Sequence, residues 1–190
     1  EFKKVKAELL RVEPIEIRVD CPRCKIKGEA KAKPLDKKDW ELYKKIENMD
    51  VPYWYPKDVK FFGQEPRRNE KRGITHPYQM FSRRNLIALS TLWHYINGVK
   101  DSNIRDKLKF GFTGILYYVS LMNREKKGRE KPTPRRGTLY ISSFICDLNA
   151  LTTFETKLKT IFKNVGQIIN IKNTDIFISI MDAQRLEDIQ

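Results

Sequence analysis

The sequence predicts an α+β protein with a mainly helical middle, an N-terminal hairpin and a C-terminal strand–helix–strand unit. Apolar and polar residues alternate over residues 15–19, just before a Cys-Pro-Arg-Cys turn. Residues 82–122 repeat apolar side chains every three or four positions, as helices do. The final third reads as strand, helix and strand. We therefore divide the chain into a mostly helical region, residues 1–137, and a strand–helix–strand region, residues 138–190.

The overall charge points to a polyanionic partner. The 190 residues include 38 Lys+Arg against 24 Asp+Glu, which gives a net charge of +14, and 40% are hydrophobic. Such a charge attracts nucleic acid or an anionic membrane. Nucleic acid is favoured, because the basic residues lie in loop-like stretches rather than along one amphipathic helix. The alternative is a solvated charge that binds nothing. No apolar run approaches the ~20 residues that span a bilayer, so we expect no membrane partner.

The cysteines and the first residues indicate the compartment. Three cysteines, two of them close together and one remote, do not suggest a disulfide framework, so we expect a reducing, cytoplasmic location. The start, EFKKVKAELL, is charged and helical, resembles no secretory leader and lacks an initiating Met. We expect it to be internal to a longer protein.

The first third predicts four elements. Residues 1–12 have helical spacing that Pro14 would end, and a strand follows at residues 15–19. The CPRC turn then leads into a lysine-rich return strand over residues 25–33, and a helix begins at Asp36, whose carboxylate can cap it.

The middle predicts two long helices after irregular segments. The segment VPYWYP and residues 61–75 break regular structure, the latter as a loop or small ribbon. One helix is capped by Ser82 and ended by Gly98, and the next runs from Asp101 or Ser102 toward Met122. Their apolar faces are Leu86, Leu89, Trp93 and Ile96 in the first, and Ile104, Leu108, Phe112, Ile115, Val119 and Met122 in the second. Gly111 and Gly114 each cost roughly 1 kcal/mol unless close packing compensates.

The last third predicts a βαβ unit. A strand over residues 138–146 precedes a helix over residues 149–166, which Asn149 caps and whose apolar face is Phe154, Leu158, Ile161 and Val165. A second strand follows over residues 174–183, so a small parallel sheet is expected. This strand reaches Asp182 and then turns toward a helix. We expect such an end to open a ligand-binding unit rather than close a domain.

Cys21 and Cys24 have the spacing of a zinc knuckle. A structural site needs four ligands and no second pair follows; the other soft candidates are Cys146, His76 and His94, of which Cys146 reads better as a small buried residue. The alternatives are a degenerate zinc ribbon or a site completed by residues outside this chain. A redox role is disfavoured, because a lysine-rich strand rather than a helix follows the motif.

Three stretches are candidates for contact with nucleic acid. Aromatics in PYWYP suit stacking on unpaired bases, although core packing is the stronger alternative. Arginines in the first turn of a helix suit a phosphate, or else a salt bridge to a local acid. The basic segment 123–137 suits phosphates or remains a solvated loop. With the charged residues of 61–75, the candidates are Tyr53, Trp54, Tyr55, Arg67, Arg68, Lys71, Arg72, Arg83, Arg84, Lys126, Lys127, Arg129, Lys131, Arg135 and Arg136.

Catalytic residues are not evident. Neither His is placed beside a convincing nucleophile, and no paired-carboxylate motif or glycine-rich phosphate loop is present. We expect no chemistry from the chain on its own.

An ordered series of motifs resembles one family. CPRC with its lysine-rich strand, VPYWYP, FSRRNLIALSTLW, the glycine-containing helix ending in SLMNR, and RGTLYIS together cover most of residues 20–145. Their order and spacing resemble the cysteine-knuckle insertion of the SAM-dependent, DPPY-type DNA amino-methyltransferases, which modify adenine N6 or cytosine N4. ISIMDAQRLEDI resembles the family's GDA-like turn, with Met181 where the family usually has Gly.

The resemblance implies a function for the chain. Asp182 would match the acid near the cofactor adenine, and SAM would be the cofactor of the parent protein. The family's cofactor loop and DPPY motif are not in these 190 residues, so residues 1–137 would be the DNA-recognition insertion and residues 138–190 a piece of the methyltransferase core. The expected partners are DNA and the remainder of the methyltransferase chain. The alternatives are an independent DNA- or RNA-binding module and a structural domain whose charge aids solubility.

Overall fold

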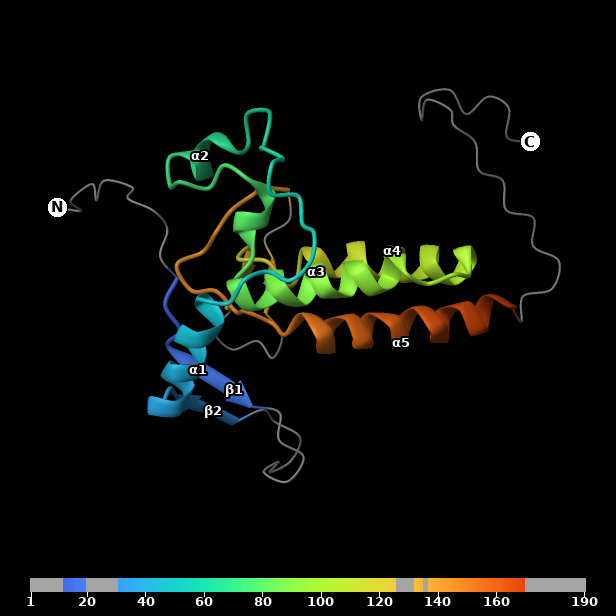
Figure 1. Ribbon diagram of the computed structural model, residues 1–190, viewed down its shortest axis with the longest axis horizontal. Helices are drawn as coiled ribbons and strands as arrows, with labels where there is room; N and C mark the ends of the chain where they lie inside the picture. The colour runs from blue at the N-terminus through green and yellow to red at the C-terminus, as the bar shows by residue number, and fades with distance from the viewer. Residues whose placement is uncertain (1–11, 20–30, 126–131, 135–136, 170–190) are drawn as a thin grey trace.

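The computed structural model describes residues 12–19, 31–125, 132–134 and 137–169. These residues form helices and short antiparallel strands, which confirms the α+β class (Figure 1). The predicted helix at the N-terminus falls on residues 1–11, outside the described residues, as do the CPRC turn and the second strand predicted for residues 174–183.

An antiparallel hairpin lies near the start of the described chain. β1 (Glu16–Val19) pairs with β2 (Lys31–Pro34), with Glu16 opposite Pro34. α1 (Lys37–Glu47) follows, and the Asp36 carboxylate accepts a hydrogen bond from the Asp39 backbone N–H while the Asp39 carboxylate accepts one from the Asp36 N–H. The predicted cap at Asp36 is therefore confirmed, and the bond to Asp39 makes it reciprocal, so that two backbone donors at the helix start are satisfied.

Three helices form a layer that contains the main core. α3 (Arg83–Asn97), α4 (Ser102–Leu116) and α5 (Ala150–Ile169) lie side by side (Figure 1). Side chains of Ser82, Asp101 and Asn149 accept hydrogen bonds from the first turns of these helices; this confirms the predicted caps at Ser82 and Asn149 and identifies Asp101 as the cap of α4. The buried residues of this core are Leu89, Ile96, Phe112, Ile115, Val119, Ala150 and Phe154.

Glycines bring α4 and α5 close together. A Cβ on Gly111 would lie 3.0 Å from Leu158 Cδ2 and 3.4 Å from the Phe154 ring. A Cβ on Gly114 would lie 2.8 Å from Lys157 Cε. The close packing that would compensate for glycine inside a helix is therefore present, most clearly at Gly111.

The segment after α4 differs from the prediction. α4 ends at Leu116, so Val119 and Met122 are buried beyond the helix rather than on it. Residues 138–146 do not form the predicted strand: apart from an isolated antiparallel bridge between Ile145 and Arg124, they are irregular.

Buried side chains of other segments hold the two ends of residues 138–146: Asn69 donates to the Leu139 carbonyl oxygen near the start, and the fully buried Asn123 holds Cys146 at the end. The Asn123 side-chain amide donates to the Cys146 carbonyl oxygen at 2.9 Å, and its backbone carbonyl accepts from the Cys146 N–H at 2.8 Å. The end of the segment is thereby held beside the short antiparallel pair of β3 (Asn123–Arg124) and β4 (Thr133–Pro134), with no parallel neighbour among the described residues.

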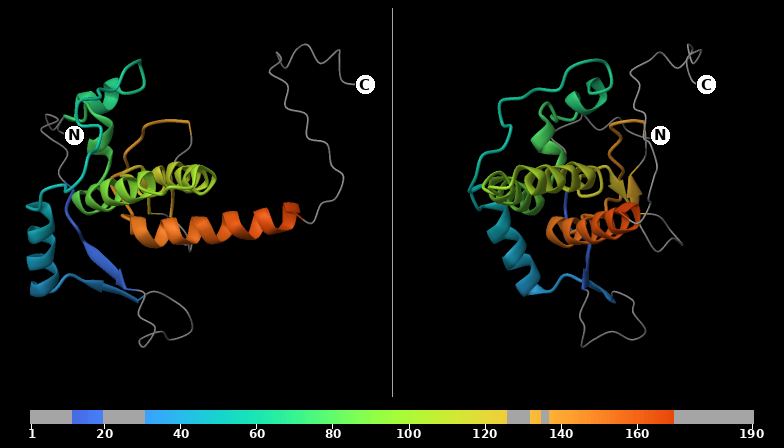
Figure 2. Two further views of the ribbon diagram at one scale, coloured as in Figure 1. Left: turned by 45° about the vertical axis from the view of Figure 1, so that its right-hand side comes forward. Right: turned by 90° about the vertical axis from the view of Figure 1, so that its right-hand side faces the viewer.

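A separate lobe is built from residues 61–75, which we call the α2 lobe. The Phe61 N–H donates to the Thr75 carbonyl oxygen at 2.9 Å and closes its base. Within it lies the short α2 (Arg67–Glu70), so the predicted loop contains one helical turn. The lobe and the hairpin β1–β2 lie on opposite sides of the helical layer (Figure 2).

A second, smaller apolar cluster joins the α2 lobe to the helices. Its buried members are Ile74, Met80, Leu121, Met122 and Ile141, and Met80 ends the 3₁₀ helix η1 (Pro77–Met80). The lobe is also tied down by Asn69, which is 1% exposed and donates to the Leu139 carbonyl oxygen at 2.7 Å.

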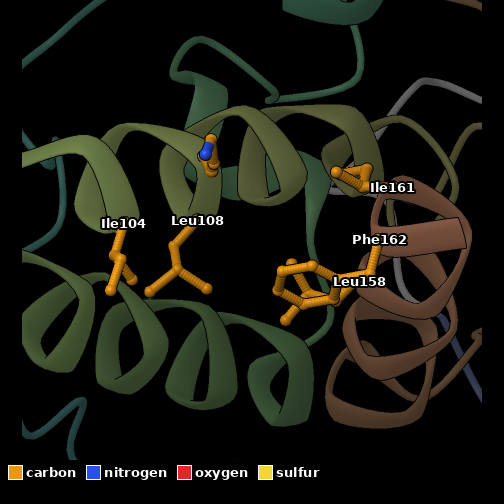
Figure 3. Close-up of a pocket in the computed structure, with 6 residues that line it drawn as sticks. Ile104, Leu108, Leu158, Ile161 and Phe162 are labelled. Atoms are coloured by element: carbon orange, nitrogen blue, oxygen red, sulfur yellow. The ribbon is translucent and has the colours of Figure 1, made fainter. Parts of the chain in front are cut away.

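The far end of the helical layer is apolar and partly open. A groove of about 100 Å³ lies between α4 and α5, with Ile104 and Leu108 on one side and Leu158, Ile161 and Phe162 on the other (Figure 3). Phe162 is 60% exposed and Ile104 52%. Within the described residues, none of the helices combines the length and the apolar character needed to cross a membrane.

Candidate nucleic-acid interface

The two arginines at the start of α3 bind protein groups. Arg84 Nη2 donates to the backbone carbonyl oxygen of Asp147 at 2.6 Å and to its carboxylate at 3.0 Å. Arg83 Nε donates to the Met49 carbonyl oxygen at 2.8 Å. Arg84 thus takes the salt bridge that was the alternative to a phosphate contact, and both side chains hold distant segments against α3.

Asp147 is the centre of a polar network. Its carboxylate also accepts from Ser82 Oγ at 2.9 Å and from Asn85 Nδ2 at 2.8 Å. Asn85, 1% exposed, further donates to the Leu148 carbonyl oxygen at 2.8 Å. Desolvation by the surrounding segments raises the pKa of Asp147, although its side chain stays 36% exposed, and the neighbouring Arg84 and Ser82 oppose the shift by stabilising the charged form. This network anchors the chain before α5 to the start of α3.

The α2 lobe presents basic side chains that remain available. Arg67, Arg68 and Lys71 are exposed and Arg72 is half-buried. In the described part of the chain, none of the four forms an ion pair. The side chains of Asn69 and Ile74 are buried and fix the backbone of this turn. The basic side chains of the turn point toward solvent. Such an arrangement suits contact with phosphates.

The VPYWYP segment alternates between packed and exposed rings. The Tyr53 ring stacks on His94, with centroids 4.0 Å apart and planes 13° apart. Tyr55 packs edge-on against Tyr78, with centroids 5.4 Å apart. Trp54, between them, is 69% exposed. Both alternatives for this segment are therefore represented, since Tyr53 and Tyr55 pack against the protein while Trp54 stays available.

A hollow of about 270 Å³ lies beside Trp54. Its other lining residues are Trp93, His94 and Asn97, all from the C-terminal part of α3. Lys109 Nζ lies 5.5 Å from the centroid of the Trp93 ring. Of these α3 residues, the sequence indicated only His94 as a site candidate, and that for a metal, while Trp93 was predicted on the apolar face of the helix. The consecutive aromatic residues 93–95, followed by Asn97 one helical turn after Trp93, were the available signal.

Several predicted site residues lie outside the described residues. These are Cys21, Cys24, Lys126, Lys127, Arg129, Lys131, Arg135, Arg136 and Asp182. Among the residues that are described, no three His, Cys, Asp or Glu side chains gather as metal ligands would. Cys146 is half-buried, and burial raises the pKa of its thiol, as for a structural cysteine.

The described residues do not form a SAM site. A strand, a glycine-rich turn and a helix in direct succession would be needed to cradle the cofactor, and the described elements contain no such unit. Comparison with protein-family models, curated proteins and solved structures finds no match to this chain.

Proposed function

We propose that the chain is the DNA-recognition part of a cytoplasmic SAM-dependent DNA methyltransferase that acts on an exocyclic amino group of adenine or cytosine. The chain binds DNA and transfers no methyl group alone. Its catalytic motifs and its SAM belong to the remainder of the parent protein, with Asp182 as a contact to that cofactor. Methyl transfer to DNA by the purified chain with added SAM would contradict the proposal that catalysis requires the remainder of the parent protein.

The observation that carries DNA binding is the α2 lobe. It places Arg67, Arg68 and Lys71 on a fixed turn, exposed and without ion pairs among the described residues. Arginines that served only the fold would resemble Arg84, whose guanidinium is committed to Asp147. A net charge of +14 supports the same conclusion, because it draws a polyanion to the surface.

The ordered motifs support the choice of methyltransferase among DNA-binding proteins. In that reading, the CPRC turn with Cys21 and Cys24 forms a zinc knuckle, and the basic segment from Lys126 to Arg136 adds phosphate contacts. These contacts position the protein on the duplex and do not read sequence by themselves.

Charge reversal in the α2 lobe tests the proposal. We expect the triple variant Arg67→Glu, Arg68→Glu, Lys71→Glu to bind a labelled duplex at least about tenfold more weakly, since three phosphate contacts become repulsive. The matched control is Lys38→Glu, Lys44→Glu, Lys45→Glu, three exposed lysines of α1 with the same change in net charge. Equal loss of affinity in both variants would show that net charge, rather than the lobe, binds DNA.

A further inference from the structure

Trp54 is held outward by the segment around it. Its neighbours Tyr53 and Tyr55 pack on His94 and Tyr78, and Pro52 and Pro56 restrict the backbone on either side. With the rings on either side packed against the protein, the Trp54 ring is left toward solvent. An indole ring that is 69% exposed on so constrained a segment gains no burial from the fold, which suggests a ligand contact.

The hollow beside Trp54 has the size and lining for one planar ring system. Its volume of about 270 Å³ is just below the roughly 300–1,000 Å³ of pockets that enclose drug-sized ligands. Trp54 offers a largely exposed ring, whereas Trp93 and His94 line the hollow with the parts of their rings that Phe112 and Tyr53 leave uncovered. The Asn97 amide adds hydrogen-bonding groups: its Nδ2 donates to the Trp93 carbonyl oxygen at 2.9 Å, and its Oδ1 has no partner among the described residues.

Charge argues against a cationic occupant. Aromatic surfaces also bind cations, but Lys109 Nζ already lies 5.5 Å from the centroid of Trp93 and would repel a second positive group. A nucleobase is a flat, uncharged ring attached to an anionic backbone. It therefore matches the aromatic lining, the nearby lysine and the net charge of +14 together.

We propose that the hollow formed by Trp54, Trp93, His94 and Asn97 binds a single unpaired DNA base by stacking, with the Asn97 amide at the base edge. A base inside a duplex has both faces covered by its neighbours, so the hollow selects DNA with a base out of the stack. This inference rests on the proposed DNA binding. It adds a preference for DNA with an unpaired base, which phosphate contacts alone would not give.

Two duplexes of equal length and labelling test the hollow, one fully matched and one with a single-adenine bulge. Stacking of one base predicts that the wild-type chain binds the bulged duplex about 5- to 150-fold more tightly. Trp54→Ala removes this preference, read as the ratio of the two affinities measured for the same variant, and Trp54→Phe keeps part of it. The control is Phe110→Ala, which removes another exposed aromatic ring (65% exposed) and keeps the full preference.

The outcomes separate this inference from the proposed function. Equal affinity of the wild-type chain for the two duplexes would contradict base binding in the hollow, and so would an undiminished preference in Trp54→Ala. Neither result would contradict the proposed DNA binding. Failure of the wild-type chain to bind either duplex overturns both. Because Trp54 is largely exposed, its replacement is not expected to unfold the protein, and circular dichroism of each variant checks this.

Discussion

At the scale of single residues, one arginine contributes to the fold while another is exposed without an ion pair among the described residues. Arg84 and Arg67 both belong to helical turns rich in arginine, yet Arg84 contacts Asp147, 63 residues later in the chain, and Arg67 forms no ion pair within the described residues. Local sequence cannot distinguish the two, because the deciding acid is remote. The start of α3 therefore has a structural role, and the phosphate-binding role that we propose falls to the α2 lobe.

Asp147 predicts a specific dependence of stability on pH. Burial raises its pKa in the folded protein above the ordinary value, so the folded state binds a proton at a pH where the unfolded chain does not. Stability from this group therefore rises as the pH falls through the folded pKa, and is lost as the pH rises through it. We expect the wild-type free energy of unfolding to increase relative to that of Asp147→Asn between pH 7 and about pH 4, measured by urea denaturation.

The comparison of the two proteins cancels titrating groups that Asp147 does not influence. Glu47 is not one of them: burial raises its pKa, and so does the charge of Asp147, so its share adds to the wild-type gain in stability on acidification. A wild-type protein that instead loses stability relative to Asp147→Asn on acidification would show that the ion pair with Arg84 outweighs burial. The pKa of Asp147 would then be lowered, contrary to the environment described for it.

At the scale of elements, the contact between α4 and α5 depends on one of its two glycines. The Cβ position of Gly111 faces Leu158, Phe154 and Ile161, side chains of the helix interface that cannot all move aside. The Cβ position of Gly114 faces the far end of the Lys157 side chain, which is flexible. Two glycines three residues apart in one helix therefore have different roles.

Alanine substitution separates these roles. Gly114→Ala is expected to raise the free energy of unfolding by about 0.5–1 kcal/mol, because alanine favours the helix and Lys157 can rotate away. Gly111→Ala is expected to lower it by up to about 2 kcal/mol, because overpacking outweighs the same helical gain. Thermal or urea denaturation measures both. Stabilisation by both substitutions to the same degree would contradict the close packing assigned to Gly111.

At the scale of the whole molecule, sequence predicted the helices better than the strands. Caps at Asp36, Ser82 and Asn149 and the apolar faces of α3 and α5 depend on residues within a few positions of each other, and the structure has them. The segment 138–146 was predicted as a strand, but its two ends are held by the buried side chains of Asn69 and Asn123, which are remote from it in sequence.

The candidate interface shows the same limit. The exposed charges of the α2 lobe and the exposed Trp54 were among the predicted site residues. The hollow was not predicted, because its lining joins VPYWYP to α3, about forty residues later, and only the tertiary fold brings them together. The zinc knuckle, the segment from Lys126 to Arg136 and Asp182 stay predictions.

The DNA binding that we propose for this chain relies on phosphate contacts, so its affinity must depend on salt. Titration of the purified chain with a labelled duplex between about 50 and 200 mM salt should give a log affinity that falls linearly with log salt. We expect a slope steeper than about −3, and a slope smaller in magnitude by about 3 in the Arg67→Glu, Arg68→Glu, Lys71→Glu variant. Absence of duplex binding even at 50 mM salt, or an affinity that does not change with salt, would contradict the account.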